Sequence, residues 1–202
     1  MSNMSHREIM QWEAGKAHVL DAPEREREMP AATVLELLSL EGSETVVDYG
    51  AGTGRLALAV AERLAPRGRV IAIEDSSKMF QLLSERVTGV ACAEPMLIDG
   101  DDVPLPDEAA NRILAVDVLH HIRPNTLAEM RRLLAPDGLL LLIDWERGHS
   151  CEGGPPDGVL LTPSQAIREL AAAGLEAHLV ESPFAHRYVL LATTETCGSE
   201  RT

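Results

Sequence analysis

The chain has 202 residues, 45% of them hydrophobic and 25% charged, which is the composition of one globular domain with a sizeable core. Its 32 acidic residues outnumber 18 basic ones, and the formal net charge of -14 disfavours nucleic acid and membrane surfaces as partners. No apolar run reaches the ~20 residues of a membrane span, and the first twenty residues lack the basic and apolar regions of a signal peptide. We therefore expect a cytoplasmic protein, a monomer or a homodimer, with no metal site.

The N-terminal part predicts a helical lid. A helix is expected over residues 7–19, and the charged stretch "DAPEREREMP" after it is expected to lie over the domain rather than inside it. A second helix is expected over residues 31–40, where the apolar positions have helical spacing. Residues 1–30 are thus interpreted as a lid, residues 31–194 as the core and residues 195–202 as a flexible tail of a single domain.

Strand and helix patterns alternate from residue 44 onward. Short apolar runs predict strands in "ETVVDYG", "RVIAIE", "PMLID", "RILAVDV" and "LLLLIDW". Amphipathic runs predict helices in "GRLALAVAERLA", in "SSKMFQLLSERV" with a Ser N-cap, and in "NTLAEMRRLLAPDG", which Pro136 and Gly138 should stop. This alternation predicts a parallel sheet with helices on both faces.

The C-terminal part departs from this alternation. A helix over residues 163–173 is followed by the strands "LEAHLVES" and "HRYVLLATT", separated by a link too short for a helical crossover. These strands should pair antiparallel. The predicted fold is therefore an α/β open sheet of seven strands, mostly parallel, with a C-terminal antiparallel strand.

Three glycines stand where the first predicted strand becomes a helix, in "DYGAGTG" (residues 48–54). Such a turn lets the backbone approach a ligand, and ligands of open α/β sheets bind at the carboxyl ends of the strands. Arg55 occupies the position of the third glycine in the dinucleotide fingerprint G-x-G-x-x-G, which disfavours a nicotinamide-dependent oxidoreductase.

The stretch "DYGAGTG" resembles the glycine motif of class I S-adenosylmethionine (SAM)-dependent methyltransferases, and "VIAIEDSSKM", "LIDGDDVPLPDE", "AVDVLHHI" and "RRLLAPDGLLLLIDW" resemble the next motifs in order. The resemblance implies a Rossmann-like fold, SAM as cofactor, S-adenosylhomocysteine (SAH) as product, and a small-molecule methyl acceptor. It places the ribose on Glu74 and the adenine near Asp99 and Gly100, with Asp101 as the alternative. The cofactor-binding residues that it implies are Asp48, Gly50, Ala51, Gly52, Gly54, Glu74, Asp75, Met79, Asp99, Gly100 and Asp117.

His120, His121 and Asp144 are the candidate catalytic residues, because the histidines follow the fourth strand and Asp144 lies at the end of the fifth, where the transferred methyl group should emerge. A histidine there could accept a proton from the acceptor, or it could only shape the site. We expect the acceptor to enter between the N-terminal helix and the loop of residues 146–158.

Two other functions stay open. Several thiolates can bind a metalloid, so Cys92, Cys151 and Cys197 would be its ligands in a metalloid methyltransferase; the alternative is that they are incidental free thiols. A SAM-binding protein without catalytic activity is the other, because methyl transfer needs no fixed catalytic residue. The sequence does not identify the acceptor.

Overall fold

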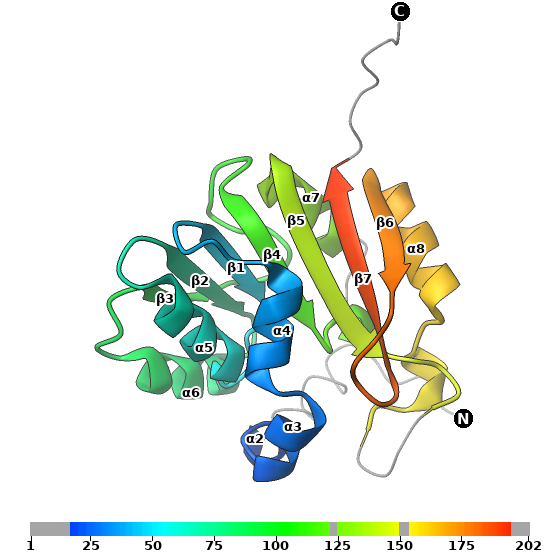
Figure 1. Cartoon of the computed structure of the whole chain (residues 1–202), viewed down its shortest axis with the longest axis horizontal. Helices are drawn as coiled ribbons and strands as arrows, with labels where there is room; N and C mark the ends of the chain where they lie inside the picture. The colour runs from blue at the N-terminus through cyan, green and yellow to red at the C-terminus, as the bar shows by residue number, and fades with distance from the viewer. Residues whose placement is uncertain (1–16, 122–124, 150–153, 195–202) are drawn as a thin grey trace, which may run out of the picture.

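The computed structural model describes residues 17–121, 125–149 and 154–194. In these residues, seven strands form one sheet in the order β3-β2-β1-β4-β5-β7-β6 (Figure 1). Their bounds are β1 Thr45–Tyr49, β2 Arg69–Glu74, β3 Ala93–Leu97, β4 Ala110–Val116, β5 Leu134–Trp145, β6 Leu175–Val180 and β7 Arg187–Thr194. The α-helices are α2 Ala17–Leu20, α3 Pro23–Glu28, α4 Ala31–Leu38, α5 Arg55–Leu64, α6 Ser77–Val87, α7 Thr126–Leu133 and α8 Pro163–Ala172, with short 3-10 helices η1 Leu119–His121 and η2 Asp157–Val159.

The strand directions confirm the predicted mixed sheet. β1 pairs in parallel with β2 and β4, β2 with β3, and β4 with β5. β7 runs antiparallel to both of its neighbours, β5 and β6. The chain goes from β1 outward to β3 and then returns to β4 on the other side of β1. Strand order therefore reverses between β1 and β4, which is where ligands bind in open α/β sheets.

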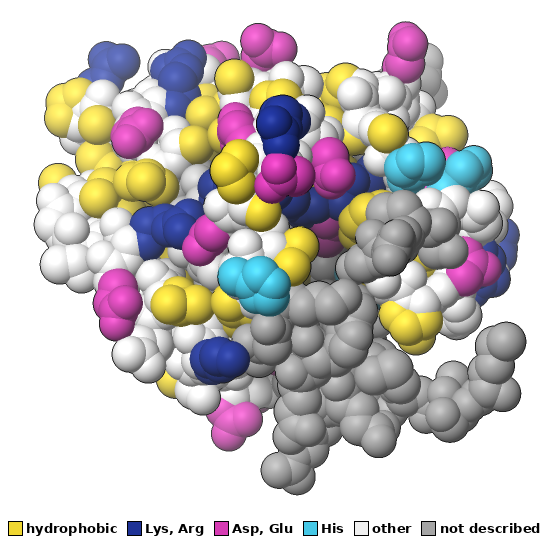
Figure 2. Space-filling model, turned by 90° about the horizontal axis from the view of Figure 1, so that it is seen from below, with side chains coloured by type: hydrophobic (Ala, Val, Ile, Leu, Met, Phe, Trp, Pro, Cys, Tyr) yellow, Lys and Arg dark blue, Asp and Glu magenta, His cyan; other side chains and the backbone are white. Residues whose placement is uncertain are grey.

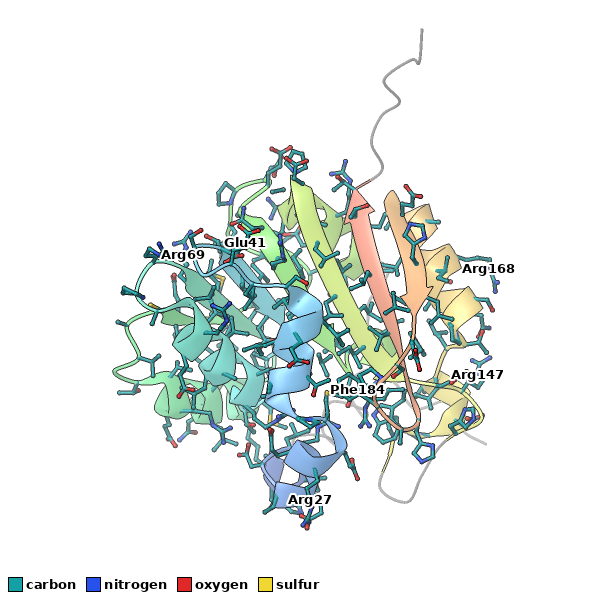
Figure 3. All side chains as sticks on the ribbon, in the orientation of Figure 1. Arg27, Glu41, Arg69, Arg147, Arg168 and Phe184 are labelled. Atoms are coloured by element: carbon teal, nitrogen blue, oxygen red, sulfur yellow. The ribbon has the colours of Figure 1, made fainter. Side chains whose placement is uncertain are left out.

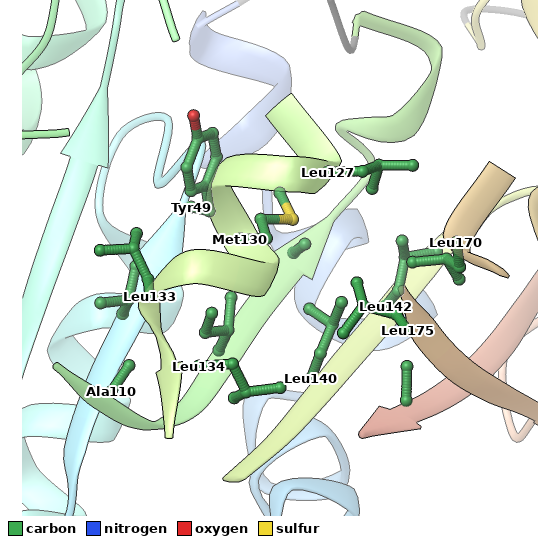
Figure 4. Packing of buried hydrophobic residues seen from close by; sticks show 14 of the residues in the cluster. Tyr49, Ala110, Leu127, Met130, Leu133, Leu134, Leu140, Leu142, Leu170 and Leu175 are labelled. Carbon is green, nitrogen blue, oxygen red and sulfur yellow. The ribbon is translucent and has the colours of Figure 1, made fainter. Parts of the chain in front are cut away.

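Two apolar clusters cover the two faces of the sheet. Along β1, Val46 belongs to one cluster and Val47 to the other, as the alternation of side chains along a strand requires. The first cluster contains side chains of α4, α5 and α6. The second contains side chains of α7 and α8, among them Leu127, Met130 and Leu170 (Figure 4). Both layers are built mostly from aliphatic residues, because aromatic residues make up only 3% of the chain.

The helix starts follow local sequence signals. Ser76 caps α6, and its hydroxyl accepts the backbone N–H of Met79 at 3.4 Å, as the predicted N-cap requires. Thr162 and Gln165 form a reciprocal capping box at the start of α8. No helix in the described part of the chain is both long and apolar enough to cross a membrane.

The structure corrects several predicted elements, among them the end of one helix, a short helix that was not predicted and the bounds of the third strand. The helix expected to run to Pro136 ends at Leu133, and β5 already begins at Leu134, because a residue before proline disfavours helical backbone. The stretch "DAPEREREMP" contains the short helix α3, which starts with Pro23 at its first position. The third strand covers Ala93–Leu97 rather than residues 95–99.

The parallel strands begin along one side of the sheet and end along the opposite side. Figure 3 shows Glu41 and Arg69 at the edge where the parallel strands begin, and Arg27 and Arg147 at the edge where they end. The N-terminal segment lies along this second edge (Figure 1), which is called the carboxyl edge below.

Candidate active site

The glycine turn joins β1 to α5 at the carboxyl edge. Gly50, Gly52 and Gly54 all have left-handed backbone, with φ of 75°, 57° and 83°. A Cβ on Gly50 would lie 2.5 Å from a methyl group of Val118, and one on Gly54 would lie 2.6 Å from a methyl group of Leu83. Both the backbone conformation and the close contacts therefore require glycine at positions 50 and 54.

Glu74 ends β2 beside this turn, as the sequence predicted, and only 6% of its surface is exposed. One carboxylate oxygen accepts the N–H of Gly52 at 2.8 Å, and the other accepts the N–H groups of Asp75 and Ser76 at 3.1 and 2.9 Å. Burial raises the pKa of Glu74 to about 7, although the N–H groups of Ser76 and Gly52 oppose the rise. A carboxylate oxygen accepts two hydrogen bonds, so the oxygen that faces Gly52 has room for a ligand hydroxyl.

Asp48 lies in β1 beneath the turn and is almost fully buried. Within the described residues its Oδ2 has no hydrogen-bond partner. Burial raises the pKa of Asp48 to about 7, against the attraction of the Arg55 guanidinium. A buried polar atom without a partner is uncommon and calls for a donor, so this oxygen suits a cationic or N–H group of a ligand.

Other predicted cofactor contacts surround the turn. The N–H of Ala51 donates to the carbonyl of Ile73 at 2.8 Å, which ties the turn to β2. Asp75 is half-buried after β2, and Met79 is buried in the first turn of α6. These residues therefore lie at the same edge as Glu74.

The loop after β3 holds the two candidates for the adenine contact. Asp99 is exposed, and Gly100 has a left-handed backbone with φ of 90°. The alternative candidate, Asp101, accepts a hydrogen bond from the Thr126 hydroxyl at 2.7 Å and thereby anchors this loop to α7. Asp99 is the carboxylate on the solvent side of the loop, so it stays the predicted contact.

Asp117 follows β4 and lies in the same row, in a left-handed conformation with φ of 55°. Its carboxylate accepts hydrogen bonds from Arg187, with Nε at 3.0 Å from Oδ1, and from Arg25, with Nη2 at 2.5 Å from Oδ2. Burial disfavours its charged form, but the two guanidinium groups hold the pKa of Asp117 below its ordinary value. Its side chain is thus part of an ionic cluster, which the sequence prediction did not include.

His120 and Asp144 form a buried pair. Nδ1 of His120 lies 3.0 Å from Oδ1 of Asp144, and the Asp144 carboxylate also accepts the N–H groups of Leu119 at 2.5 Å and Trp145 at 2.7 Å. Only 1% of Asp144 is exposed. A carboxylate acceptor at Nδ1 assigns the proton of the neutral ring to that nitrogen, which makes Nε2 the basic one.

Tyr188, which sequence reasoning missed, stands opposite Asp144 on β7. Its hydroxyl is buried and has no hydrogen-bond partner within residues 17–121, 125–149 and 154–194. Burial raises the pKa of Tyr188, and the negative charge of Asp144 adds to the rise, so the hydroxyl is neutral and can donate. A tyrosine in a mostly apolar strand gives no sequence signal of such a position.

The N-terminal strap, defined as residues 17–29, covers the glycine turn. Leu20 Cδ1 would lie 3.3 Å from a Cβ on Gly52. The Asp21 carboxylate accepts the Thr53 hydroxyl at 2.7 Å and pairs with Arg86 at 2.8 Å. Glu26 pairs with Arg55 and Arg25 with Asp117, while Met29 is fully buried in the core. The strap thus contacts the turn, the helices α5 and α6, and the end of β4.

Several candidates are not among the residues described at the carboxyl edge. Outside the described residues are the side chain of His121, Cys151, Cys197 and residues 150–153 of the predicted acceptor loop. Cys92 precedes β3, at the edge where the strands begin, so it does not reach the carboxyl edge. Among the described residues there is no group of three or more His, Cys, Asp or Glu side chains that could hold a metal ion.

Comparison with known proteins agrees with this arrangement. Residues 46–138 match the family model described as "Methyltransferase domain". The chain is 33% identical over 105 residues to the ubiquinone/menaquinone biosynthesis C-methyltransferase of Bordetella avium, an alignment that covers 50% of this chain and 41% of that protein. The chain therefore spans less than half the length of this curated relative.

Solved structures extend the similarity to most of the chain. A SAM-dependent methyltransferase from Aquifex aeolicus superposes with a TM-score of 0.81 at 25% identity, over 89% of this chain and 97% of that one. The [4+2]-cyclase SpnF shares the fold, with a TM-score of 0.67 at 18% identity over 81% of this chain and 80% of that one. Residues 46–138 thus match a methyltransferase domain, and these similarities support the resemblance to class I SAM-dependent methyltransferases that the sequence motifs indicated.

Proposed function

We propose that this chain transfers the methyl group of SAM to a small-molecule acceptor at the carboxyl edge between β1 and β5. The observation that carries the proposal is Glu74, a buried carboxylate held by the N–H of Gly52 across the gap between β2 and the glycine turn. A carboxylate in this position can accept hydrogen bonds from the two hydroxyls of a ribose.

The donors and acceptors of this edge fit SAM. Glu74 has capacity for a ribose hydroxyl, and the partnerless oxygen of Asp48 accepts a donor such as an ammonium group. The loop with Asp99 and Gly100 supplies an acceptor for the adenine amino group. The predicted cofactor contacts near the turn are Gly50, Ala51, Gly52, Gly54, Asp75, Met79 and the backbone of Asp117.

When it is bound, SAM supplies a methyl group on a positively charged sulfur, which is an activated leaving group. The residues of the chain then have to hold the acceptor close and aligned, which can contribute ~7–11 kcal/mol to lowering the barrier. The strap covers the turn and excludes water. Where the methyl acceptor reacts through a hydroxyl group, Nε2 of His120 takes the proton of that hydroxyl. Asp144 meanwhile accepts the hydrogen bond from Nδ1–H and stabilises the cationic ring.

The family match supports the cofactor half of this proposal more than the acceptor half. The matched residues 46–138 contain the glycine turn, Glu74 and His120, but they end before Asp144, Tyr188 and Arg187. The fold alone also does not fix the reaction, because a [4+2]-cyclase shares it. The name of the Bordetella relative therefore does not transfer an acceptor to this chain.

The test uses SAM labelled in its methyl group, purified protein and a small-molecule extract of cells. We expect a labelled product with the wild-type protein and with Gly89→Val, and none with Gly52→Val. The two positions are matched, since both have left-handed backbone (φ 57° and 81°). They differ in their surroundings, because a Cβ on Gly89 would meet nothing within 4 Å. SAH binding without any labelled product, across extracts and protein fractions, would instead favour a non-catalytic SAM-binding protein.

A further inference from the structure

Arg25, Asp117 and Arg187 form a compact ionic cluster at the carboxyl edge, on the side of β4, β5 and β7. Arg187 donates to Asp117 from Nε at 3.0 Å and from Nη2 at 3.2 Å, and Arg25 of the strap donates from Nη2 at 2.5 Å. The exposed fractions of the three side chains are 2%, 12% and 14% for Arg187, Arg25 and Asp117. The guanidinium of Arg187 also stacks on the indole ring of Trp145, 3.6 Å from its centroid.

The charges of this cluster do not balance. Two guanidinium groups share the single carboxylate of Asp117. Of the other charged side chains at this edge, Arg55 pairs with Glu26, and Asp144 accepts hydrogen bonds from two backbone N–H groups and His120 rather than from either arginine of the cluster. Buried charge is costly unless it is paired. The three side chains of the cluster together carry a net charge of +1, in a chain whose net charge is -14.

The cluster also holds unused hydrogen-bond donors. A guanidinium carries five N–H donors. Within the described residues, Arg187 donates only from Nε and Nη2, and Arg25 only from Nη2. Because Trp145 covers one flat face of Arg187, further partners have to approach the edge of its guanidinium in its plane. A planar carboxylate matches this geometry, since it can accept two parallel hydrogen bonds from one guanidinium.

The position of the cluster indicates which ligand it serves. Glu74 and the glycine turn lie at the ends of β2 and β1, whereas Asp117 follows β4 and Arg187 begins β7 next to Trp145 at the end of β5. Neighbouring strands are ~4.8 Å apart, so the backbone of Arg187 at the start of β7 stands about three strands, or ~14 Å, from the end of β1. Its guanidinium reaches back to Asp117, which follows β4, the strand next to β1. Seen from the carboxyl edge, basic and acidic side chains lie side by side near the middle of this face (Figure 2).

We propose that Arg25 and Arg187 bind a carboxylate of the methyl acceptor, so that the acceptor is a small organic anion. This inference rests on the proposed methyl transfer, because it assigns the cluster to the acceptor of that reaction. Arg25 belongs to the strap and Arg187 to β7, so a carboxylate between them ties the strap to the sheet while the acceptor is bound. SAM carries a carboxylate too, and the experiment has to separate the two sources.

The experiment has two titrations. In the first, formate, acetate and benzoate are titrated into protein saturated with SAH. In the second, SAH or 5′-methylthioadenosine, which lacks the amino-acid part of SAH, is titrated into the ligand-free protein. The variants are Arg25→Gln and Arg187→Gln, with Arg27→Gln as the matched control. Arg27 lies in the same helix, but 71% of its side chain is exposed. Because Arg187 is buried, Arg187→Lys and circular dichroism spectra separate loss of the site from loss of the fold.

We expect at least one carboxylate to bind wild-type protein and Arg27→Gln, with at least tenfold weaker binding to Arg25→Gln and Arg187→Gln. Benzamide, the neutral analogue, should not bind, and SAH affinity should change less than threefold.

Two results would overturn the inference. One is that no carboxylate binds protein that does bind SAH. The other is that the variants lose SAH affinity but keep affinity for 5′-methylthioadenosine, which would assign the cluster to the cofactor. Failure of wild-type protein to bind SAH would count against the proposed function itself, and carboxylate titration of the ligand-free protein then still tests the cluster.

Discussion

The two halves of the carboxyl edge are built in different ways. On the half formed by β2 and β1, polar groups meet the backbone: Glu74 accepts three N–H groups, and the turn donates to the carbonyl of Ile73. On the half formed by β4, β5 and β7, Asp144 also accepts two backbone N–H groups, but the pairs that distinguish this half join side chains: His120 meets Asp144, and Arg25 and Arg187 meet Asp117. The first half depends on backbone shape, so it tolerates little change. The second depends on a few exchangeable side chains, which is how one fold can serve many acceptors.

The sharpest test of this division is Asp144→Asn. An amide presents N–H donors to groups that are themselves donors, so His120 loses the acceptor that fixes its ring. We expect turnover to fall about a hundredfold to ten-thousandfold for a hydroxyl acceptor, while SAH affinity changes less than about threefold. Initial rates and calorimetry measure both quantities, with exposed Asp137→Asn as the control. A parallel loss of SAH affinity would show that the two halves do not work separately.

The backbone half is tested by Gly54→Ala and Gly89→Ala. The two glycines have nearly the same φ, 83° and 81°, but only the Cβ on Gly54 would meet Leu83, at 2.6 Å. Left-handed backbone costs alanine roughly 1–2 kcal/mol in both variants, and overpacking adds roughly 1–3 kcal/mol at position 54. We expect urea denaturation to give a loss of about 2–5 kcal/mol for Gly54→Ala and about 1–2 kcal/mol for Gly89→Ala. Equal losses would mean that the turn is not constrained by its contact with α6.

The smallest expected effect concerns Glu74→Gln. Its pKa of about 7 in the ligand-free protein means that the carboxyl group is mostly protonated at pH 6 and mostly ionised at pH 8. A ribose hydroxyl donates to the ionised form, so SAH affinity of the wild-type protein should rise about tenfold from pH 6 to pH 8.

At pH 8, Glu74→Gln should bind SAH about tenfold to a hundredfold more weakly than the wild type, and its affinity should depend less on pH. Calorimetry at both pH values measures this, and Glu94→Gln, at an exposed position of β3, is the control. Asp48→Asn identifies the part of the pH dependence that belongs to Asp48, whose pKa is also about 7. If Glu74→Gln had the SAH affinity and the pH dependence of the wild type, the predicted contact between Glu74 and the ribose would be wrong.

Much of the fold could be predicted from local signals. Apolar runs, a Ser N-cap and the short link between the last two strands were enough for seven strands and for the antiparallel end of the sheet. The end of α7 was misjudged because Pro136 and Gly138 were interpreted as the helix stop, whereas backbone restriction before Pro136 acts earlier in the chain. The helix in "PERERE" was missed because its sequence has no apolar face.

The site was predicted unevenly for a physical reason. Glu74 and the glycines follow from spacing along one βαβ unit, so the motif contains their geometry. Arg25 lies 92 positions before Asp117 in the sequence, and Arg187 lies 70 positions after it, so no local pattern relates the three residues. Only the topology of the sheet, with β7 inserted beside β5, brings Arg187 to Trp145 and to the end of β4.

The strap has a consequence for the timing of the reaction. Leu20 and Asp21 contact the turn at Gly52 and Thr53, and fully buried Met29 fixes the end of the strap in the core. For a cofactor bound against the turn as proposed, we expect exchange only when the segment before Met29 lifts, with Met29 as the hinge point. A barrier of this kind slows entry and exit by the same factor and leaves the dissociation constant unchanged. If SAH leaves through the same opening that SAM enters, the lifetime of the closed strap sets an upper limit on the number of turnovers per second.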